Sequence, residues 1–218
     1  MDTTYWRGGA EDEAMQEEHG FIWRAMLETV DVDLAAKRVL DAGCNRGGFL
    51  RLLADRHGIA EGWGYDPATS AIEDARGLVG QRPLRFEAAD TVPAEWSGFD
   101  VAFSHEVLYL VHDLSAHASA IFRALAPGGV YFAVMGIHTR SPLMMQWHSA
   151  NVDELRLPKL YDIDEVVAIF RGVGFDASAA RLAMRFVPAD GHGHHGGSHL
   201  VDWLDYYYDQ KLLLRFSR

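Results

Sequence analysis

The sequence predicts an α/β fold in which helices cover both faces of a doubly wound, mostly parallel sheet. Three observations favour this fold. Short apolar strands alternate with segments of helix length, glycine or proline follows the strand ends, and the composition is that of a globular domain. The chain has 218 residues, of which 49% are hydrophobic and 23% charged. That length predicts one domain with one substantial core.

The first element expected is an amphipathic helix over residues 11–30. Apolar residues recur there every three or four positions, and acidic residues near its start suit the helix dipole. The polar arm before it carries Tyr5, Trp6 and Arg7. Two aromatic side chains on a tail are costly in water unless they cover something. We therefore expect residues 1–30 to form a lid on the main domain, residues 31–218.

Five short apolar segments have the pattern of buried strands: 38–43, 62–66, 84–90, 99–104 and 130–135. Helices are expected to begin or lie between them at 49–54, 70–78 and 117–125. Later segments are expected to form an irregular stretch, one helix and two strands at one edge of the sheet: 137–160, 164–170, 177–187 and 211–217. Strands and helices alternating at this spacing indicate a parallel sheet.

Charge and cysteine content exclude several classes of protein. The chain has 20 Lys and Arg against 31 Asp and Glu, a net charge of −11, so we expect no nucleic-acid partner. The single cysteine, Cys44, excludes an internal disulfide and sites built from several thiolates. No apolar stretch approaches the ~20 residues that span a bilayer, and the acidic N-terminus does not resemble a signal peptide. We expect a cytoplasmic protein with no membrane partner, either a monomer or a homodimer.

A glycine turn between the first strand and the next helix predicts a ligand cradle. The run Gly43 to Gly48 (G-C-N-R-G-G) should turn its backbone N–H groups outward, with no side chain in the way of a ligand. Asn45 stands where a dinucleotide fingerprint has its second glycine, and no phosphate-loop Gly-Lys-Ser/Thr follows. The turn is therefore typical of a nucleoside ligand without a tightly held pyrophosphate.

Two acidic residues follow the next two strands. Asp66 can accept bonds from ribose hydroxyls, and Asp90 can accept one from an adenine amino group. A single aspartate at a strand end is more often a turn residue or a helix cap. Because the carboxyl ends of parallel strands meet at one edge, these two and the glycine turn together favour a ligand site.

On these residues the chain resembles the class I S-adenosylmethionine-dependent methyltransferases. The run Val39 to Gly47 resembles the family motif D-x-G-x-G-x-G, with Asn45 in the place of the middle glycine. Asp66 and Asp90 match the acidic residues on the ribose and adenine sides. Residues 99–108 resemble the fourth-strand motif and 125–129 the turn before the fifth strand, so the resemblance spans about 39–176.

The resemblance implies a Rossmann-like sheet with one antiparallel strand near its C-terminal edge, and S-adenosylmethionine as cofactor. The cofactor-binding residues it implies are Asp41, Gly43, Asn45, Gly47, Asp66, Pro67, Asp90, Thr91, Ser104 and His105. It also implies in-line methyl transfer to an O, N or S atom of a small molecule, catalysed mostly by positioning and desolvation. A cofactor-binding protein without turnover and a nicotinamide-dependent oxidoreductase remain alternatives, and Asn45 disfavours the second.

A general base, where one is needed, is expected beyond the fourth and fifth strands. The catalytic candidates are His138 and Tyr109, and an imidazole with its ordinary pKa of about 6.5 suits that task at neutral pH. Segments 137–160 and 189–199 are expected to lie on the substrate side as loops. The histidines of the second segment can bind metals, but its glycines fit a solvated loop, and we expect no physiological metal site.

Overall fold

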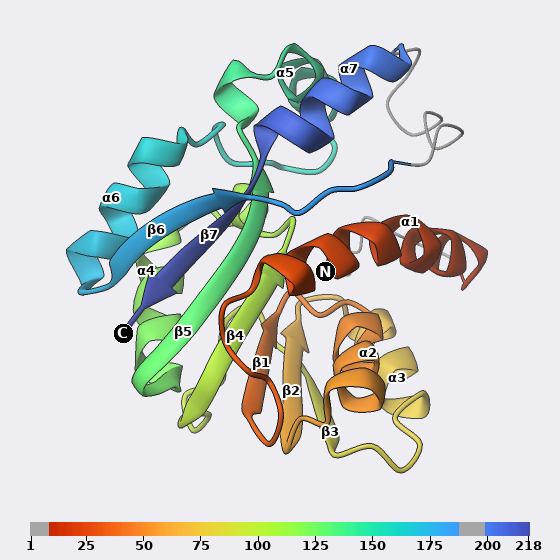
Figure 1. Cartoon of the computed structure of the whole chain (residues 1–218), viewed down its shortest axis with the longest axis vertical. Helices are drawn as coiled ribbons and strands as arrows, with labels where there is room; N and C mark the ends of the chain where they lie inside the picture. The colour runs from red at the N-terminus through yellow and green to blue at the C-terminus, as the bar shows by residue number, and fades with distance from the viewer. Residues whose placement is uncertain (1–8, 188–198) are drawn as a thin grey trace.

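In a computed structural model, which describes residues 9–187 and 199–218, the chain forms one seven-stranded sheet between two layers of helices (Figure 1). The strand order is β3-β2-β1-β4-β5-β7-β6. The contacts from β3 through to β5 are parallel, whereas β7 runs antiparallel to both β5 and β6. This arrangement confirms the predicted mostly parallel sheet with one antiparallel strand near the C-terminal edge.

The strands are β1 (Arg38–Ala42), β2 (Glu61–Asp66), β3 (Leu84–Ala88), β4 (Phe99–His105), β5 (Leu125–Gly136), β6 (Asp176–Arg181) and β7 (Lys211–Ser217). The start of β5 corrects the expected range of 130–135. Leu125 already pairs with Phe99, and the register then shifts before Val130 pairs with Val101. Gly128 lies in the intervening bulge at a φ of 79°, a conformation that glycine adopts without strain.

The helices are α1 (Gly9–Thr29), α2 (Gly48–His57), α3 (Thr69–Gly77), α4 (Leu114–Ala124), α5 (Pro142–Asn151), α6 (Ile163–Val173) and α7 (Leu200–Asp205). Helix α5 corrects the expectation that 137–160 is irregular. Ser141 caps it by accepting a bond from the Met144 N–H at 3.4 Å, and Pro142 occupies its first turn. Within the described ranges, no helix is long and apolar enough to cross a bilayer.

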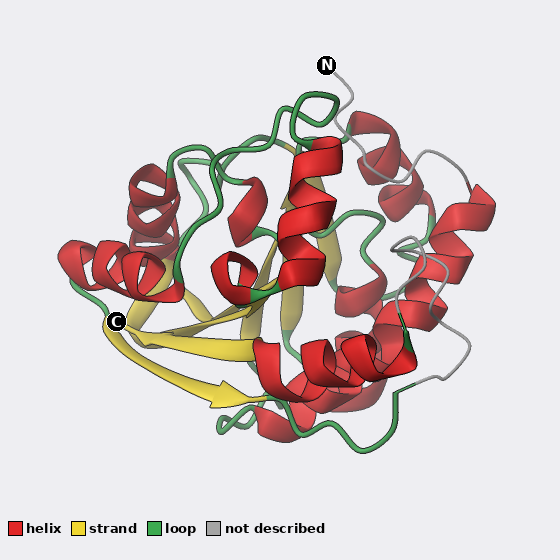
Figure 2. Ribbon diagram, turned by 90° about the horizontal axis from the view of Figure 1, so that it is seen from above, coloured by secondary structure: helices red, strands yellow, loops and turns green. Residues whose placement is uncertain are grey.

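The two faces of the sheet carry separate apolar layers, visible in Figure 2 as helices on either side of the strands. Helices α1, α2 and α3 cover one face, where Met26, Leu50 and Ile72 are fully buried. Helices α4 and α6 cover the other face with Ile121 and Phe170. Because the chain moves outward from β1 to β3 and then returns to β4 beside β1, the carboxyl ends of β1 and β4 lie where open α/β sheets bind ligands.

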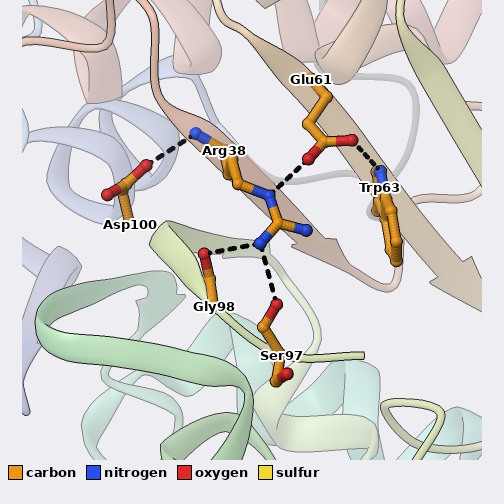
Figure 3. A network of polar contacts seen from close by, with 6 residues as sticks. All are labelled: Arg38, Glu61, Trp63, Ser97, Gly98 and Asp100. Carbon is orange, nitrogen blue, oxygen red and sulfur yellow. Dashed lines mark hydrogen bonds and ion pairs between the residues drawn. The ribbon is translucent and has the colours of Figure 1, made fainter. Parts of the chain in front are cut away.

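A polar network fastens the opposite, amino end of the sheet. Figure 3 shows its members: Arg38, Glu61, Trp63, Ser97, Gly98 and Asp100. The Arg38 guanidinium pairs with Glu61. It also donates to the carbonyl oxygens of Ser97 and Gly98 at 3.1 and 3.0 Å. Its backbone N–H donates to Asp100 at 2.8 Å. The network therefore ties the starts of β1, β2 and β4 together, away from the ligand-binding edge.

Candidate functional site

The turn between β1 and α2 is a backbone cradle. Gly43 and Gly47 have φ angles of 75° and 71°, and Asn45 between them has a φ of 45°. Glycine adopts this left-handed region freely, and asparagine is among the residues that tolerate it. The N–H groups of Gly43 and Cys44 both donate to the Tyr65 carbonyl, at 2.9 and 3.1 Å. The cradle is thus held against the end of β2.

Neither Gly43 nor Gly47 has room for a side chain. A Cβ on Gly43 would lie 2.5 Å from Cγ2 of Val107, and one on Gly47 would lie 2.3 Å from Cζ of Phe86. The sequence predicted that side chains here would block a ligand. The structure adds that they would strike the protein itself. Since Val107 follows β4, the cradle touches the loop that leads to the other half of the site.

Asp66 supports the cradle from the end of β2. Its carboxylate accepts the N–H of Asn45 at 3.0 Å and the N–H of Ala68 at 2.9 Å. The group is half-buried at the end of β2, and a carboxylate can accept bonds from hydroxyl donors. Asp90 and Thr91 follow β3 and are exposed. The ends of β1, β2 and β3 are therefore brought to one edge, as the sequence predicted.

Asp41 is the buried acid beneath this edge, with 4% of its surface exposed. Burial raises the pKa of its carboxyl to about 8, and the negative charge of Asp66 adds to the effect. A cation that binds nearby would favour the ionised form and lower that pKa. Burial also raises the pKa of the Cys44 thiol, which therefore packs as an unreactive group.

The side chains of Ser104 and His105 at the end of β4 are engaged with the protein. Ser104 is fully buried, with its hydroxyl 2.5 Å from that of Tyr131. The His105 Nδ1 accepts a bond from the Trp23 indole at 3.3 Å, and its ring lies 4.6 Å from that of His19. Burial lowers the pKa of His105 well below its ordinary value. Within the described residues, Nε2 of His105 has no hydrogen-bond partner, and contact of these two residues with a cofactor stays a prediction.

The two catalytic candidates lie together beyond β4 and β5. The rings of Tyr109 and His138 meet edge to face at 4.6 Å, and Tyr109 meets Trp147 in the same way at 5.7 Å. His138 is only 1% exposed, and burial lowers its pKa to about 4. This corrects the expectation of a pKa near 6.5. The ring is neutral at pH 7, but it is a weaker base than an exposed imidazole.

Sequence reasoning missed a charged pair beside His138. Glu106 has a positive φ of 57°, and its Oε1 lies 3.1 Å from Nζ of Lys211. Its Oε2 lies 4.0 Å from Nε2 of His138. The two ends of the ion pair are 105 positions apart, so no local pattern joins them. The one available signal is a lysine directly before three leucines at the start of β7.

The lid and metal predictions fall largely outside the described residues. Tyr5, Trp6 and Arg7 lie there, as does the histidine-rich segment up to residue 198. In the part of the chain that is described, no group of three or more His, Cys, Asp or Glu side chains could hold a metal ion. The second half of α1 packs into the core through Ile22 and Met26. Movement of the arm over a ligand stays a prediction.

Comparison with known proteins identifies the family of the chain. The model of the family described as "Methyltransferase domain" matches residues 15–179. The chain is similar to a probable S-adenosylmethionine-dependent methyltransferase of Mycolicibacterium smegmatis, 26% identical over 157 residues that cover 67% of this chain and 60% of that protein. It is also similar to a ubiquinone biosynthesis O-methyltransferase of Psychrobacter cryohalolentis. The two are 35% identical over 133 residues, which cover 57% of this chain and 50% of that protein. The chain therefore spans half to three fifths of the length of these two relatives.

Among solved structures, the chain is similar to the methyltransferase in complex with the Haloferax volcanii Trm112 methyltransferase activator. The TM-score is 0.81 at 21% sequence identity, and the match covers 96% of this chain and 94% of that one. At that identity, the likeness establishes the fold alone.

Proposed function

The chain belongs to the methyltransferase-domain family of S-adenosylmethionine-dependent proteins, and on that basis we propose that it methylates a small molecule. One observation carries the proposal. The glycine cradle stands where the strand order reverses, between β1 and β4, and the carboxylates of Asp66 and Asp90 follow β2 and β3 at the same edge of the sheet. That edge is where such sheets bind nucleoside ligands.

The residues present fit S-adenosylmethionine, which supplies a methyl group on a sulfonium centre when bound. Asp66 accepts bonds from the ribose hydroxyls, and Asp90 with Thr91 takes the adenine side. The left-handed turn from Gly43 to Gly47 lets the backbone approach the ligand. Buried Asp41 lies beneath, and a cation nearby favours its ionised form.

The residues on the acceptor side orient the nucleophile and exclude water. Tyr109 places an aromatic ring against His138 and is itself packed against Trp147, which lowers the local polarity. His138 is neutral at pH 7, because burial lowers its pKa to about 4. It therefore acts by holding the acceptor through a hydrogen bond, and general-base catalysis by this ring contributes little. Tyr109 fixes the position of that ring.

The acceptor is a small molecule, and its nucleophilic atom is oxygen. A net charge of −11 disfavours nucleic acid as the substrate. One relative is named an O-methyltransferase of ubiquinone biosynthesis, which supports oxygen as the nucleophile.

A methyl-transfer screen tests the proposal. The protein is incubated with S-adenosylmethionine and fractionated metabolite extracts, and S-adenosylhomocysteine is measured as the product. We expect its formation to depend on one fraction, to fall strongly in Asp66→Ala, and to persist in Lys37→Gln, a variant at the amino end of the sheet. Cofactor binding without turnover in any fraction would instead indicate a binding protein.

A further inference from the structure

Glu106, His138 and Lys211 form a buried polar cluster beside the cradle, and we propose that this cluster recognises an acidic hydroxyl on an aromatic ring. The inference rests on the proposed function and names the class of acceptor. Its members come from three separate places: the residue after β4, the short turn His138–Arg140 after β5, and the first residue of β7.

The cluster begins one residue from the cradle. Glu106 precedes Val107, whose Cγ2 is the atom that leaves Gly43 no room for a Cβ. Glu106 itself holds a left-handed backbone with a φ of 57°, while its N–H donates to the Val134 carbonyl at 3.0 Å. A non-glycine residue in this region is strained, and such strain gathers at functional sites. The backbone thus turns the Glu106 carboxylate toward the acceptor side.

His138 brings unsatisfied hydrogen-bonding capacity to the cluster. It is 1% exposed, and within residues 9–187 and 199–218 neither of its ring nitrogens has a hydrogen-bond partner. Buried polar atoms of this kind are usually paired, because leaving one unpaired is costly. A ligand that offers an oxygen beside this ring supplies the missing partner.

The positive charge of Lys211 favours a negatively charged ligand. Lys211 is 3% exposed, lies 3.1 Å from Glu106, and has its ammonium 5.0 Å from the ring centroids of Tyr206 and Tyr207. Glu106 balances its charge, and His138 is neutral at pH 7. A neutral amine, the form that can accept a methyl group, gains no charge attraction from Lys211. An oxyanion between His138 and Lys211 instead meets a donor and a cation.

The walls of the cluster favour a ring as the body of the acceptor. The ring of Tyr109 meets those of His138 and Trp147, and the Tyr206 ring centroid lies 5.0 Å from the Lys211 ammonium. Tyr206 begins the π-helical turn Tyr206–Gln210, a rare conformation that occurs often at functional sites. A Cβ at Gly136 would lie 2.8 Å from the Tyr206 hydroxyl and 3.0 Å from Cδ2 of His138. Glycine at that position therefore lets the two rings approach each other.

The step balances without another reactant. Lys211 stabilises the ionised hydroxyl, so its proton leaves to solvent before transfer. The acceptor oxygen then gives a lone pair to the methyl carbon, and the electrons of the carbon–sulfur bond remain on sulfur. The products are a methyl ether and a neutral thioether.

The test uses 4-nitrophenol, whose ionised form is yellow, bound to the protein in the presence of S-adenosylhomocysteine. Absorbance against pH gives the pKa of the bound phenol without any turnover. A positive charge within about 4–6 Å lowers the pKa of an acidic group by about one to three units. We expect the pKa of the bound phenol to fall by that amount in the wild-type protein. Absence of binding, or an unshifted pKa, would overturn the inference.

Paired variants assign the shift to the cluster. Glu106→Gln with Lys211→Met removes both charges together and should abolish the shift, whereas Lys211→Arg keeps the charge and should retain it. Lys37→Gln is the control for loss of a lysine elsewhere. Persistence of the shift in the double variant, or preferential methylation of 4-nitroaniline, would contradict the assignment. S-adenosylhomocysteine binding is measured by calorimetry for every variant. If the wild-type protein does not bind S-adenosylhomocysteine, the proposed function is overturned instead.

Discussion

Gly43→Ala tests the geometry of the cradle at one atom. Alanine at a φ of 75° occupies the left-handed region, which costs an L-residue about 1–2 kcal/mol. Its Cβ would also lie 2.5 Å from Cγ2 of Val107. Carbon atoms in ordinary contact are about 3.5–4.0 Å apart, so Val107 must move by about 1 Å. Such overpacking costs about 1–3 kcal/mol, and the two effects together lower the free energy of unfolding by about 2–5 kcal/mol.

Two companion variants separate the backbone cost from the clash. Gly58 has a φ of 59° with nothing within 4 Å of its Cβ position, so Gly58→Ala carries the backbone cost alone. Gly43→Ala with Val107→Ala removes the clash and keeps the backbone cost. We expect the coupling energy between positions 43 and 107 to be about 1–3 kcal/mol.

The assays are urea unfolding and calorimetric titration with S-adenosylhomocysteine. Gly43→Ala should weaken binding, because the cradle must shift to relieve the clash, and Gly58→Ala should bind as the wild type does. Equal destabilisation by the two alanine substitutions would refute the reasoning, as would the absence of a coupling energy between positions 43 and 107.

Three further predictions concern charged residues. Asp66→Ala loses the bonds to the cradle and to the ribose, and each charge-assisted bond contributes about 1.5–3 kcal/mol. The affinity for the cofactor should therefore fall at least 10-fold, and Asp66→Asn should lose less affinity. An unchanged dissociation constant for Asp66→Ala would rule out the ribose assignment. Burial raises the pKa of Asp41 to about 8, above its value in the unfolded chain, so its contribution to stability is present below about pH 4 and is lost as the pH rises through about 8. Urea unfolding of wild type and Asp41→Asn from pH 5 to 9 should show the variant gaining relative stability with pH, by about 1.4 kcal/mol per unit of pKa difference at most, and parallel profiles would contradict this. Arg38→Gln removes donors to two carbonyl oxygens and should lower the free energy of unfolding by about 1–2 kcal/mol, because the half-exposed pair with Glu61 adds little. Cofactor affinity should not change. Weakened cofactor binding would show that the two ends of the sheet are coupled.

Local patterns in the sequence were sufficient to place most of the strands and the glycine turn. The strand, turn and helix around Gly43 are encoded within about ten residues, and Asp66 is placed by the strand that precedes it. Helix α5 was not predicted, because its apolar residues show no clear helical period. Its two start signals were present in Ser141 and Pro142, whose capping role the structure shows.

The acceptor side depends on contacts between distant parts of the chain. The pKa of His138 is lowered by burial, and burial is set by Tyr109 and other residues far from it in sequence. The pair of Glu106 and Lys211 joins the end of β4 to the start of β7. A single sequence does not indicate which buried charges meet, because the strand order β4-β5-β7 must be known first.

The identity of the nucleotide ligand can be measured directly by calorimetry. Wild-type protein is titrated with S-adenosylmethionine, S-adenosylhomocysteine and NAD under one buffer condition. We expect the first two to bind one per chain with a Kd on the order of micromolar, about −8 kcal/mol, and NAD to give no heat of binding, because Asn45 occupies the place of the glycine that a pyrophosphate requires. Binding of NAD in preference to S-adenosylmethionine would contradict the assignment of the cradle.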